Sequence, residues 1–231
     1  MDFPVIFLIF LHINSLLSTT FSYEHYTPLN TVKEDILLWE SFRGGDREAF
    51  AELFRNHYEQ LFRYGTKFTA NAGLLEDCIQ ELFIELWQTK NRTPVVSVRA
   101  YLLKSLKYKL LKEHRKNRVV APVTDGDADF QWSHESLMIA GEEDREKTQR
   151  VIHALTGLTA RQKEIVYLKF YQNLSYDEIS EIMNINYQVA RNLLHQAIKS
   201  LRNRLPGLLQ IIFLLCAISR HYILQCFSTF G

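Results

Sequence analysis

Apolar residues recur at intervals of three and four positions along most of the chain between residues 33 and 206. This is the spacing of one face of an α-helix. No stretch there alternates apolar and polar residues over the length of a strand, and Gly and Pro are scarce. The pattern predicts an all-α protein. The periodic segments form two groups, which predicts two small helical domains with a linker between them.

The first predicted domain covers residues 32–118 and contains three amphipathic helices. Asp46 suits the N-cap of the first, and the residues expected to face the core are Phe50, Leu53, Phe54, His57, Tyr58, Leu61 and Phe62. The second helix has an apolar stripe formed by Leu75, Cys78, Ile79, Leu82, Phe83, Leu86 and Trp87. Its opposite face is mainly acidic and consists of Glu76, Asp77, Gln80, Glu81, Ile84 and Glu85.

The third helix of this domain follows a loop that contains Pro94. It is expected to bury Val98, Leu102, Leu106 and Leu110. Its outward face is predicted to be basic and aromatic, with Lys104, Lys107, Tyr108, Lys112 and Arg115. Such a face is a candidate for binding nucleic-acid phosphates, and the net charge of +7 over residues 99–118 supports this interpretation.

Residues 119–146 have no sustained apolar period and carry a net charge of −7. This composition predicts a flexible acidic linker with at most a short helix. The second predicted domain, residues 147–206, carries +5. The overall charge of +1 therefore hides two basic blocks on either side of an acidic one.

The second domain contains the most specific local signal in the chain. Ser175 and Glu178 have the spacing of a capping box at the start of a short helix, residues 176–183. This helix is expected to end at Asn184, which tolerates the left-handed conformation, and Asn186 can cap the next helix. Two helices joined by so tight a turn predict a helix-turn-helix.

The helix after that turn is amphipathic. Its inward residues are Ala190, Leu193, Leu194, Ala197, Ile198 and Leu201. Its outward residues are Gln188, Arg191, Asn192, His195, Lys199 and Arg202. Gln and Asn side chains can make bidentate hydrogen bonds to adenine, and Arg can make them to guanine. The basic side chains nearer the C-terminal end of the helix can bind phosphates. The outward face predicts a DNA-recognition helix, with a solvated polar face as the simpler alternative.

Composition and motifs narrow the functional classes. The three Cys form no CxxC pair, and none of the eight His has another His or a Cys at helical ligand spacing. The chain has no GxSxG motif and no Gly-rich phosphate-binding loop. We therefore predict no metal, no cofactor, no catalytic site and no small-molecule substrate, and the protein is not expected to be an enzyme.

Both ends of the chain are apolar. Residues 3–17 are similar to the core of a signal peptide, but no Lys or Arg precedes them, and at about 15 residues they are too short to span a bilayer. Residues 1–31 are predicted to be either a disordered or loosely packed extension or, the option that we favour, a stretch upstream of the true start, for which Val32 is a candidate. Residues 207–231 form a hydrophobic tail with an eleven-residue apolar run. Packing on the preceding helix, a membrane surface and a partner all stay open for it.

Four motifs in this order carry a resemblance to a known family. They are Gly45-Asp46-Arg47-Glu48-Ala49-Phe50-Ala51-Glu52-Leu53-Phe54, the run from Glu76 to Trp87, Arg99-Ala100-Tyr101-Leu102, and Leu174-Ser175-Tyr176-Asp177-Glu178-Ile179. In sequence and spacing they resemble the extracytoplasmic-function group of sigma-70-type bacterial sigma factors over about residues 33–205. The resemblance implies a dissociable subunit of RNA polymerase. Residues 32–118 would be sigma region 2, and residues 147–206 would be sigma region 4.

The resemblance implies three binding surfaces and a regulator. Binding to core RNA polymerase is implied for Asp77, Gln80, Glu81 and Ile84. Contacts with the −10 element of promoter DNA are implied for Lys90, Arg92, Arg99, Lys104, Lys107, Tyr108, Lys112 and Arg115. Contacts with the −35 element are implied for Tyr187, Gln188, Arg191, Asn192, His195 and Lys199. It also implies a cytoplasmic protein controlled by an anti-sigma factor, with a membrane-bound one among the options.

Some positions depart from the family pattern. Lys107-Tyr108 stands where many members have Arg-Asn, and Leu193 stands where many have Arg. The turn reads Asn184-Ile185-Asn186, where Gly-Ile-Ser is commoner. The promoter sequence is therefore not predicted. Two other functions stay open: a transcriptional regulator that uses the same helix-turn-helix without the polymerase core, and a membrane-anchored interaction protein held by its apolar ends.

Overall fold

The structure is a computed structural model of the 231-residue chain, and it describes residues 30–89, 94–117, 130–131 and 153–204. Every regular element in these ranges is helical, which confirms the predicted fold class. The described residues belong to two compact units. One contains residues 30–89, 94–117, 130–131 and 160–194, and the other contains residues 153–159 and 195–204.

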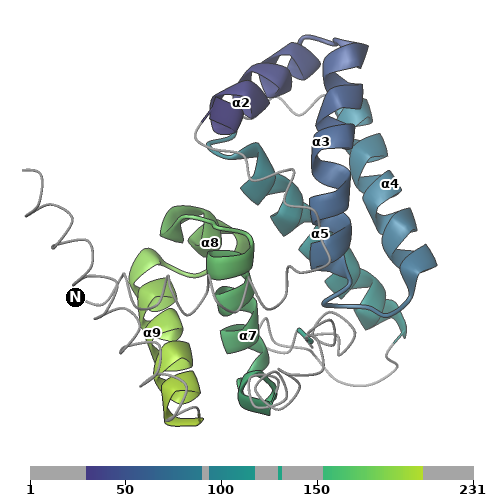
Figure 1. Ribbon diagram of the computed structural model, residues 1–231. Coiled ribbons are helices and arrows are strands. Elements are labelled where there is room, and N and C mark those ends of the chain that lie inside the picture. The colour runs from purple at the N-terminus through teal and green to yellow at the C-terminus, as the bar shows by residue number, and fades with distance from the viewer. Residues whose placement is uncertain (1–29, 90–93, 118–129, 132–152, 205–231) are drawn as a thin grey trace, which may run out of the picture. The chain divides into compact units, whose positions relative to one another are not determined.

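The first unit begins with helices α2 (Asn30–Arg43), α3 (Arg47–Gly65), α4 (Ala72–Thr89) and α5 (Val98–Asn117) (Figure 1). The sequence did not predict α2. It packs against α3, and it buries Trp39 and Phe42. Asp46 caps α3 as predicted, because its side chain accepts hydrogen bonds from the backbone N–H groups of Glu48 and Ala49.

Helices α3, α4 and α5 pack on one another around the predicted apolar positions. All four residues predicted to face inward on α5 are buried, as is the stripe of α4 except for half-buried Trp87. The opposite face of α4 is exposed at every predicted position. Helices α3 and α4 approach closely at Gly65, where a Cβ atom would lie 2.1 Å from Leu75 Cδ1. The amphipathic pattern of α4 and the inward face of α5 are confirmed.

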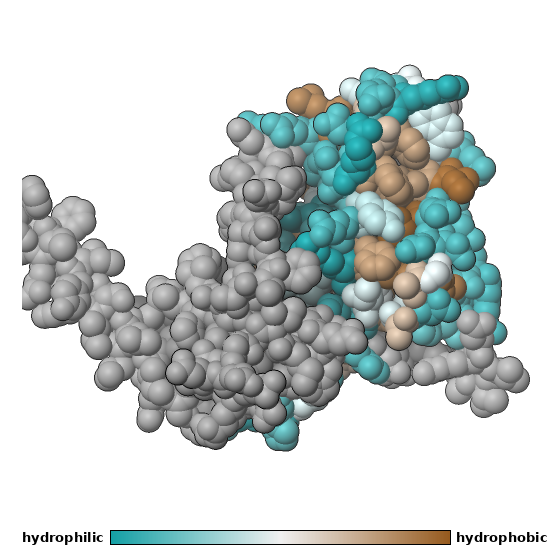
Figure 2. All heavy atoms as spheres, turned by 45° about the vertical axis from the view of Figure 1, so that its right-hand side comes forward, coloured by the Kyte–Doolittle hydropathy of each residue, from teal (hydrophilic) through white to brown (hydrophobic). Residues whose placement is uncertain are grey.

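A row of aromatic side chains on α3 is less buried than the sequence predicted. Phe50, Phe54, Tyr58 and Phe62 are half-buried. Consecutive rings contact one another from Phe54 to Phe62, and Phe54 also packs edge-on against Phe83 of α4. The face that α3 and α4 present in Figure 2 accordingly mixes hydrophobic and hydrophilic side chains.

The remaining helices are α7 (Ala160–Val166), the π-helix η3 (Tyr167–Tyr171), α8 (Tyr176–Met183) and α9 (Tyr187–Arg204). The π-helix follows α7 directly after Val166. Within the first unit, α8 packs against α5. The predicted boundary between two sequence domains therefore stays a prediction, since residues from both belong to this unit.

The second unit is small in the described part of the chain. It buries Ala154, Leu155 and Leu158 before α7 and Ala197 on α9. The predictions for the N-terminal extension, Lys90 and Arg92, most of the acidic linker and the C-terminal tail lie outside the described residues.

Candidate nucleic-acid interface

The turn between α8 and α9 has the predicted helix-turn-helix geometry. Ser175 Oγ accepts a hydrogen bond from Glu178 N at 3.2 Å, and Glu178 Oε2 accepts one from Ser175 N at 2.8 Å, so the capping box is complete. Asn184 ends α8 in the left-handed conformation, with φ 51° and ψ 50°. Asn186 Oδ1 accepts a hydrogen bond from Val189 N at 2.8 Å. These contacts fix the position at which α9 begins.

The outward face of α9 is exposed at every predicted position from Tyr187 to Arg202. Its first turns are partly ordered by contacts along the helix. The Gln188 side-chain amide donates a hydrogen bond to Asn192 Oδ1 at 3.2 Å, and the Arg191 guanidinium lies 6.0 Å from the centre of the Tyr187 ring. The Tyr187 ring packs edge-on against Tyr176 of α8. Amide and guanidinium groups are thus presented together on a helix with a fixed start, as readout of base edges requires.

The acidic face of α4 is also exposed. All four side chains predicted there to bind the polymerase core are exposed, namely Asp77, Gln80, Glu81 and Ile84. Ile84 is the large apolar residue of this group, and 53% of its surface is exposed. An apolar side chain among carboxylates provides both contact area and charge for a partner.

The basic face of α5 differs from its prediction at one central residue. Lys104, Tyr108, Lys112 and Arg115 are exposed as predicted. Lys107 was predicted to point outward, and this was wrong, because it is only 9% exposed. The physical reason is its position four residues after Leu103 and three before Leu110, which are both fully buried. Lys107 therefore lies toward the packed side of the helix.

Lys107 is paired with a buried carboxylate on α7. Its Nζ donates to Glu164 Oε1 at 2.7 Å and to Glu164 Oε2 at 3.0 Å. The Tyr64 hydroxyl of α3 donates to Glu164 Oε1 at 2.7 Å. Burial, together with the Glu164 charge, raises the pKa of Tyr64 well above its ordinary value. The phenol therefore stays protonated and acts as a donor, and the carboxylate is satisfied by two groups.

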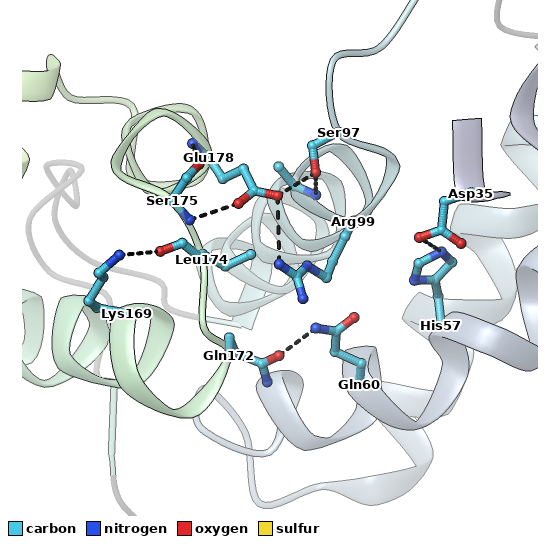
Figure 3. A network of polar contacts seen from close by, with 11 residues as sticks. Asp35, His57, Gln60, Ser97, Arg99, Lys169, Gln172, Leu174, Ser175 and Glu178 are labelled. Carbon is cyan, nitrogen blue, oxygen red and sulfur yellow. Dashed lines mark hydrogen bonds and ion pairs between the residues drawn. The ribbon is translucent and has the colours of Figure 1, made fainter. Parts of the chain in front are cut away.

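A second cluster connects α8 to the start of α5 (Figure 3). Ser97 Oγ donates to Glu178 Oε1 at 2.7 Å, and Arg99 Nη2 lies 3.7 Å from the same oxygen. Ser97 Oγ also accepts a hydrogen bond from Ala100 N at 3.2 Å. Burial by itself raises the pKa of Glu178, but the hydrogen bonds from Ser97 and Ser175 and the Arg99 charge lower it overall. Glu178 thus caps α8 and also binds α5.

A third contact joins these helices near the surface. Lys104 Nζ lies 3.9 Å from Glu181 Oε1 of α8, and both side chains are partly exposed. Of the −10 residues implied by the resemblance, Arg99, Lys104 and Lys107 therefore all face carboxylates of α7 or α8.

Several residues of this region were not singled out from the sequence. Phe130 lies in the predicted linker, yet it is only 1% exposed, and its ring packs against Tyr64, Phe68 and Tyr167. Glu164 was missed as well. The available signal was its position four residues before Leu168, which puts both side chains on the same face of a helix. A charged side chain that is buried on such a face is normally paired.

Two further findings concern other classes of site. Among the described residues, no three His, Cys, Asp or Glu side chains lie together as metal ligands would. Within the part of the chain that the structure describes, no helix is both long enough and apolar enough to cross a bilayer.

Comparison with known proteins identifies the two halves of the chain separately. Residues 53–119 match the family Sigma-70 region 2, and residues 148–201 match Sigma-70, region 4. The chain is similar to the ECF RNA polymerase sigma factor SigK of Mycobacterium ulcerans (strain Agy99), with 26% identity over 175 residues that cover 71% of this chain and 89% of the relative. SigK of Mycobacterium bovis (strain BCG / Pasteur 1173P2) is 27% identical over 174 residues, which cover 69% of this chain and 87% of the relative.

A solved structure shares the fold. It is CnrH in complex with the cytosolic domain of CnrY, which matches with a TM-score of 0.51 and 18% identity and covers 75% of this chain and 97% of that chain. At this identity the likeness concerns the fold alone.

Proposed function

Because the chain belongs to the extracytoplasmic-function group of the sigma-70 family and is an alternative sigma factor that initiates transcription, we propose that three of its helices divide the work. Helix α4 binds core RNA polymerase. Helix α5 and the loop before it bind the melted −10 element, and α9 reads the −35 duplex. The protein acts in the cytoplasm with the polymerase.

The observation that carries this proposal is the outward face of α9. Six side chains able to bind bases or phosphates are exposed on one helix: Gln188, Arg191, Asn192, His195, Lys199 and Arg202. The capped turn before the helix sets its start, and the N-terminal part of a recognition helix is the part that contacts base edges. Gln188, Arg191 and Asn192 therefore read bases, and Lys199 holds a phosphate near the other end.

The acidic face of α4 supports the assignment to the polymerase core. Its residues are exposed, although the helix buries its other face fully enough to be held in place. A regulator that uses the helix-turn-helix alone needs no such surface, and the match of residues 53–119 to sigma region 2 favours the sigma factor over that alternative.

A second protein is proposed as regulator. CnrH, which has the same fold, was solved with the cytosolic domain of CnrY. We infer that an anti-sigma factor of a comparable kind binds this chain and withholds it from the polymerase.

The test of the function is transcription in vitro with purified core polymerase on genomic DNA fragments. Specific transcripts are expected only when the chain is added, and their start sites define the −35 and −10 sequences. A variant with Asp77→Arg and Gln80→Ala should fold normally and lose core affinity, since both side chains lie on the exposed face of α4. Absence of transcripts with active core polymerase would contradict the function, and unchanged core affinity of the variant would remove α4 from it.

A further inference from the structure

One exposed side chain at the start of α9 is apolar. Val189 follows Gln188 and precedes the fully buried Ala190, and 43% of its surface is exposed. Its backbone N–H donates to Asn186 Oδ1 at 2.8 Å, so the residue belongs to the capped first turn of the helix. The N-terminal part of a recognition helix is the part that contacts base edges. When α9 binds a duplex, Val189 is therefore close to the bases.

The major groove offers one group that an apolar side chain can recognise. This group is the C5-methyl group of thymine, whereas recognition of the other bases relies on hydrogen-bond donors and acceptors. Valine suits such a contact, because in a helix its branched side chain has one strongly preferred rotamer and therefore loses little freedom on binding. The chemistry of Val189 thus favours thymine over the other three bases.

The polar side chains beside Val189 suit the same kind of base pair. Asn192 lies three residues after Val189, and side chains with this spacing are neighbours on a helix surface. Asparagine can bind N6 and N7 of adenine, the partner base of thymine. Asn192 Oδ1 accepts a hydrogen bond from the Gln188 amide at 3.2 Å, which holds the Asn192 side chain toward the start of the helix. Groups that suit thymine and adenine therefore lie side by side on α9.

We propose that Val189 reads the C5-methyl group of a thymine in the −35 duplex, and that this contact makes an A·T base pair part of the −35 element. The inference rests on the proposed function, because it needs α9 to be the −35-reading helix. It goes beyond that function by naming a base and the residue that selects it. This residue is apolar and does not belong to the polar set assigned to the −35 element.

The alternative is that Val189 is a solvent-exposed apolar side chain with no role in binding, of a kind that is common on protein surfaces. Leu37 of α2 is also apolar, and it is 67% exposed. It lies on a helix to which no DNA contact is assigned. Leu37 therefore provides a matched control for the loss of an exposed apolar side chain.

Deoxyuridine tests the methyl group directly, because its base pairs with adenine as thymine does and lacks only the C5-methyl group. Each thymine of the −35 element, on either strand, is replaced in turn in a promoter identified by transcription in vitro. Binding by holoenzyme assembled with the full chain is measured in competition with the unmodified promoter. At one position the replacement should weaken binding about fourfold, which is the effect of removing one buried methyl-sized group from an apolar contact.

Val189→Ala removes both Cγ methyl groups and should abolish the difference between thymine and uracil at that position. The two changes should not add, because they remove the two sides of one contact. Leu37→Ala should keep the full difference, and Val189→Thr, which retains one methyl group, should keep part of it. Circular dichroism confirms that the variants are folded. If Val189→Ala is unfolded, Val189→Thr is used, with a smaller reduction of the difference expected.

Two outcomes overturn the proposal and leave the proposed function standing. One is promoter-directed transcription from a −35 element in which no thymine can be found whose replacement weakens binding. The other is a sensitive position at which Val189→Ala keeps the full difference, because another residue then contacts the methyl group. If the chain directs no transcription with active core polymerase, the proposed function itself fails, and this inference fails with it.

Discussion

Helices α5 and α9 are both assigned to DNA, but they differ in what lies against them. The outward side chains of α9 are all exposed, and their hydrogen-bond and ring contacts lie on α9 and the adjoining α8. On α5, Tyr108 is 65% exposed, whereas Lys107 is buried against α7. The difference shows that a polar residue in register with buried neighbours is part of a tertiary contact, even when its chemistry suits DNA.

This contrast distinguishes the proposed binding of the −35 duplex by α9 from the proposed binding of the −10 strand by α5. Helix α9 needs no rearrangement of its exposed residues to meet a duplex. On helix α5, by contrast, Arg99, Lys104 and Lys107 each face a carboxylate of α7 or α8.

The largest effect is expected for a charge reversal at the buried pair. Glu164→Lys places two cations side by side and leaves the Tyr64 hydroxyl without its acceptor. Breaking a buried pair in this way should lower the free energy of unfolding by about 3–5 kcal/mol. Urea denaturation followed by circular dichroism measures the loss.

The matched change on the other helix is Arg202→Glu, which reverses an exposed charge of α9. Its effect on stability should stay within about 0.5 kcal/mol. Equal losses for the two variants would mean that the pair on α5 is no more buried in solution than a surface residue.

A smaller effect is expected on base recognition by α9. Arg191→Ala should cost roughly 1–3 kcal/mol of discrimination at particular −35 positions, whereas Lys199→Ala should weaken all promoters about equally and reduce the salt slope by about one. The measurement is transcription from a promoter library at two salt concentrations, with holoenzyme assembled from each variant. The same uniform loss from both variants would make Arg191 a phosphate contact, and base reading would then rest on Gln188 and Asn192.

Much of the fold could be predicted from local features of the sequence, namely helical periodicity and capping residues. The buried stripe of α4 and the inward positions of α5 follow from helical periodicity alone. The turn before α9 follows from capping chemistry, because Ser175, Asn184 and Asn186 each have the backbone role that their side chains favour. In α4, in α5 and in the turn before α9, the tertiary structure agrees with the conformation that the local sequence favours.

The parts that were missed depend on contacts between distant segments. Helix α2 carries Trp39, whose burial at 1% exposure depends on packing with helices that come later in the chain. Phe130 lies in the segment predicted to be an acidic linker, and its burial depends on ring contacts with Tyr64 and Tyr167, which are distant in the sequence.

The prediction that Lys107 faces outward overlooked its helical spacing from Leu103 and Leu110, which places it on the packed side. Its partner Glu164 is 57 residues away, and helical periodicity does not identify such a contact.

The capping box that fixes the start of α8 predicts a loss of about 1 kcal/mol for Ser175→Ala. The control is Ser180→Ala on the same helix. Its hydroxyl donates to the Tyr176 carbonyl four residues earlier, a contact that contributes little to helix stability. Both are measured by urea denaturation. A loss that is no larger for Ser175→Ala than for Ser180→Ala would show that the box does not determine where α8 begins.

The smallest effect concerns the dependence of the α5–α8 contact on pH. Burial raises the pKa of Glu178, but the contacts from Ser97, Ser175 and Arg99 outweigh it and lower the pKa. A carboxyl group with a lowered pKa in the folded state stabilises the fold above its unfolded value of about 4.3, and this stabilisation is lost as the pH falls through the folded value. Acid should therefore weaken the contact of α8 with α5.

Glu178→Gln isolates this charge, because Gln can still complete a capping box. The variant should be less stable than the unchanged chain near pH 7, and the gap should narrow as the pH falls below about 4, where the unchanged chain also loses the carboxylate. Urea midpoints at the two pH values measure the gap, and Asp177→Asn controls for the loss of one negative charge on the same turn. A gap that stays constant between the two pH values would show that the Glu178 carboxylate does not hold α8 on α5.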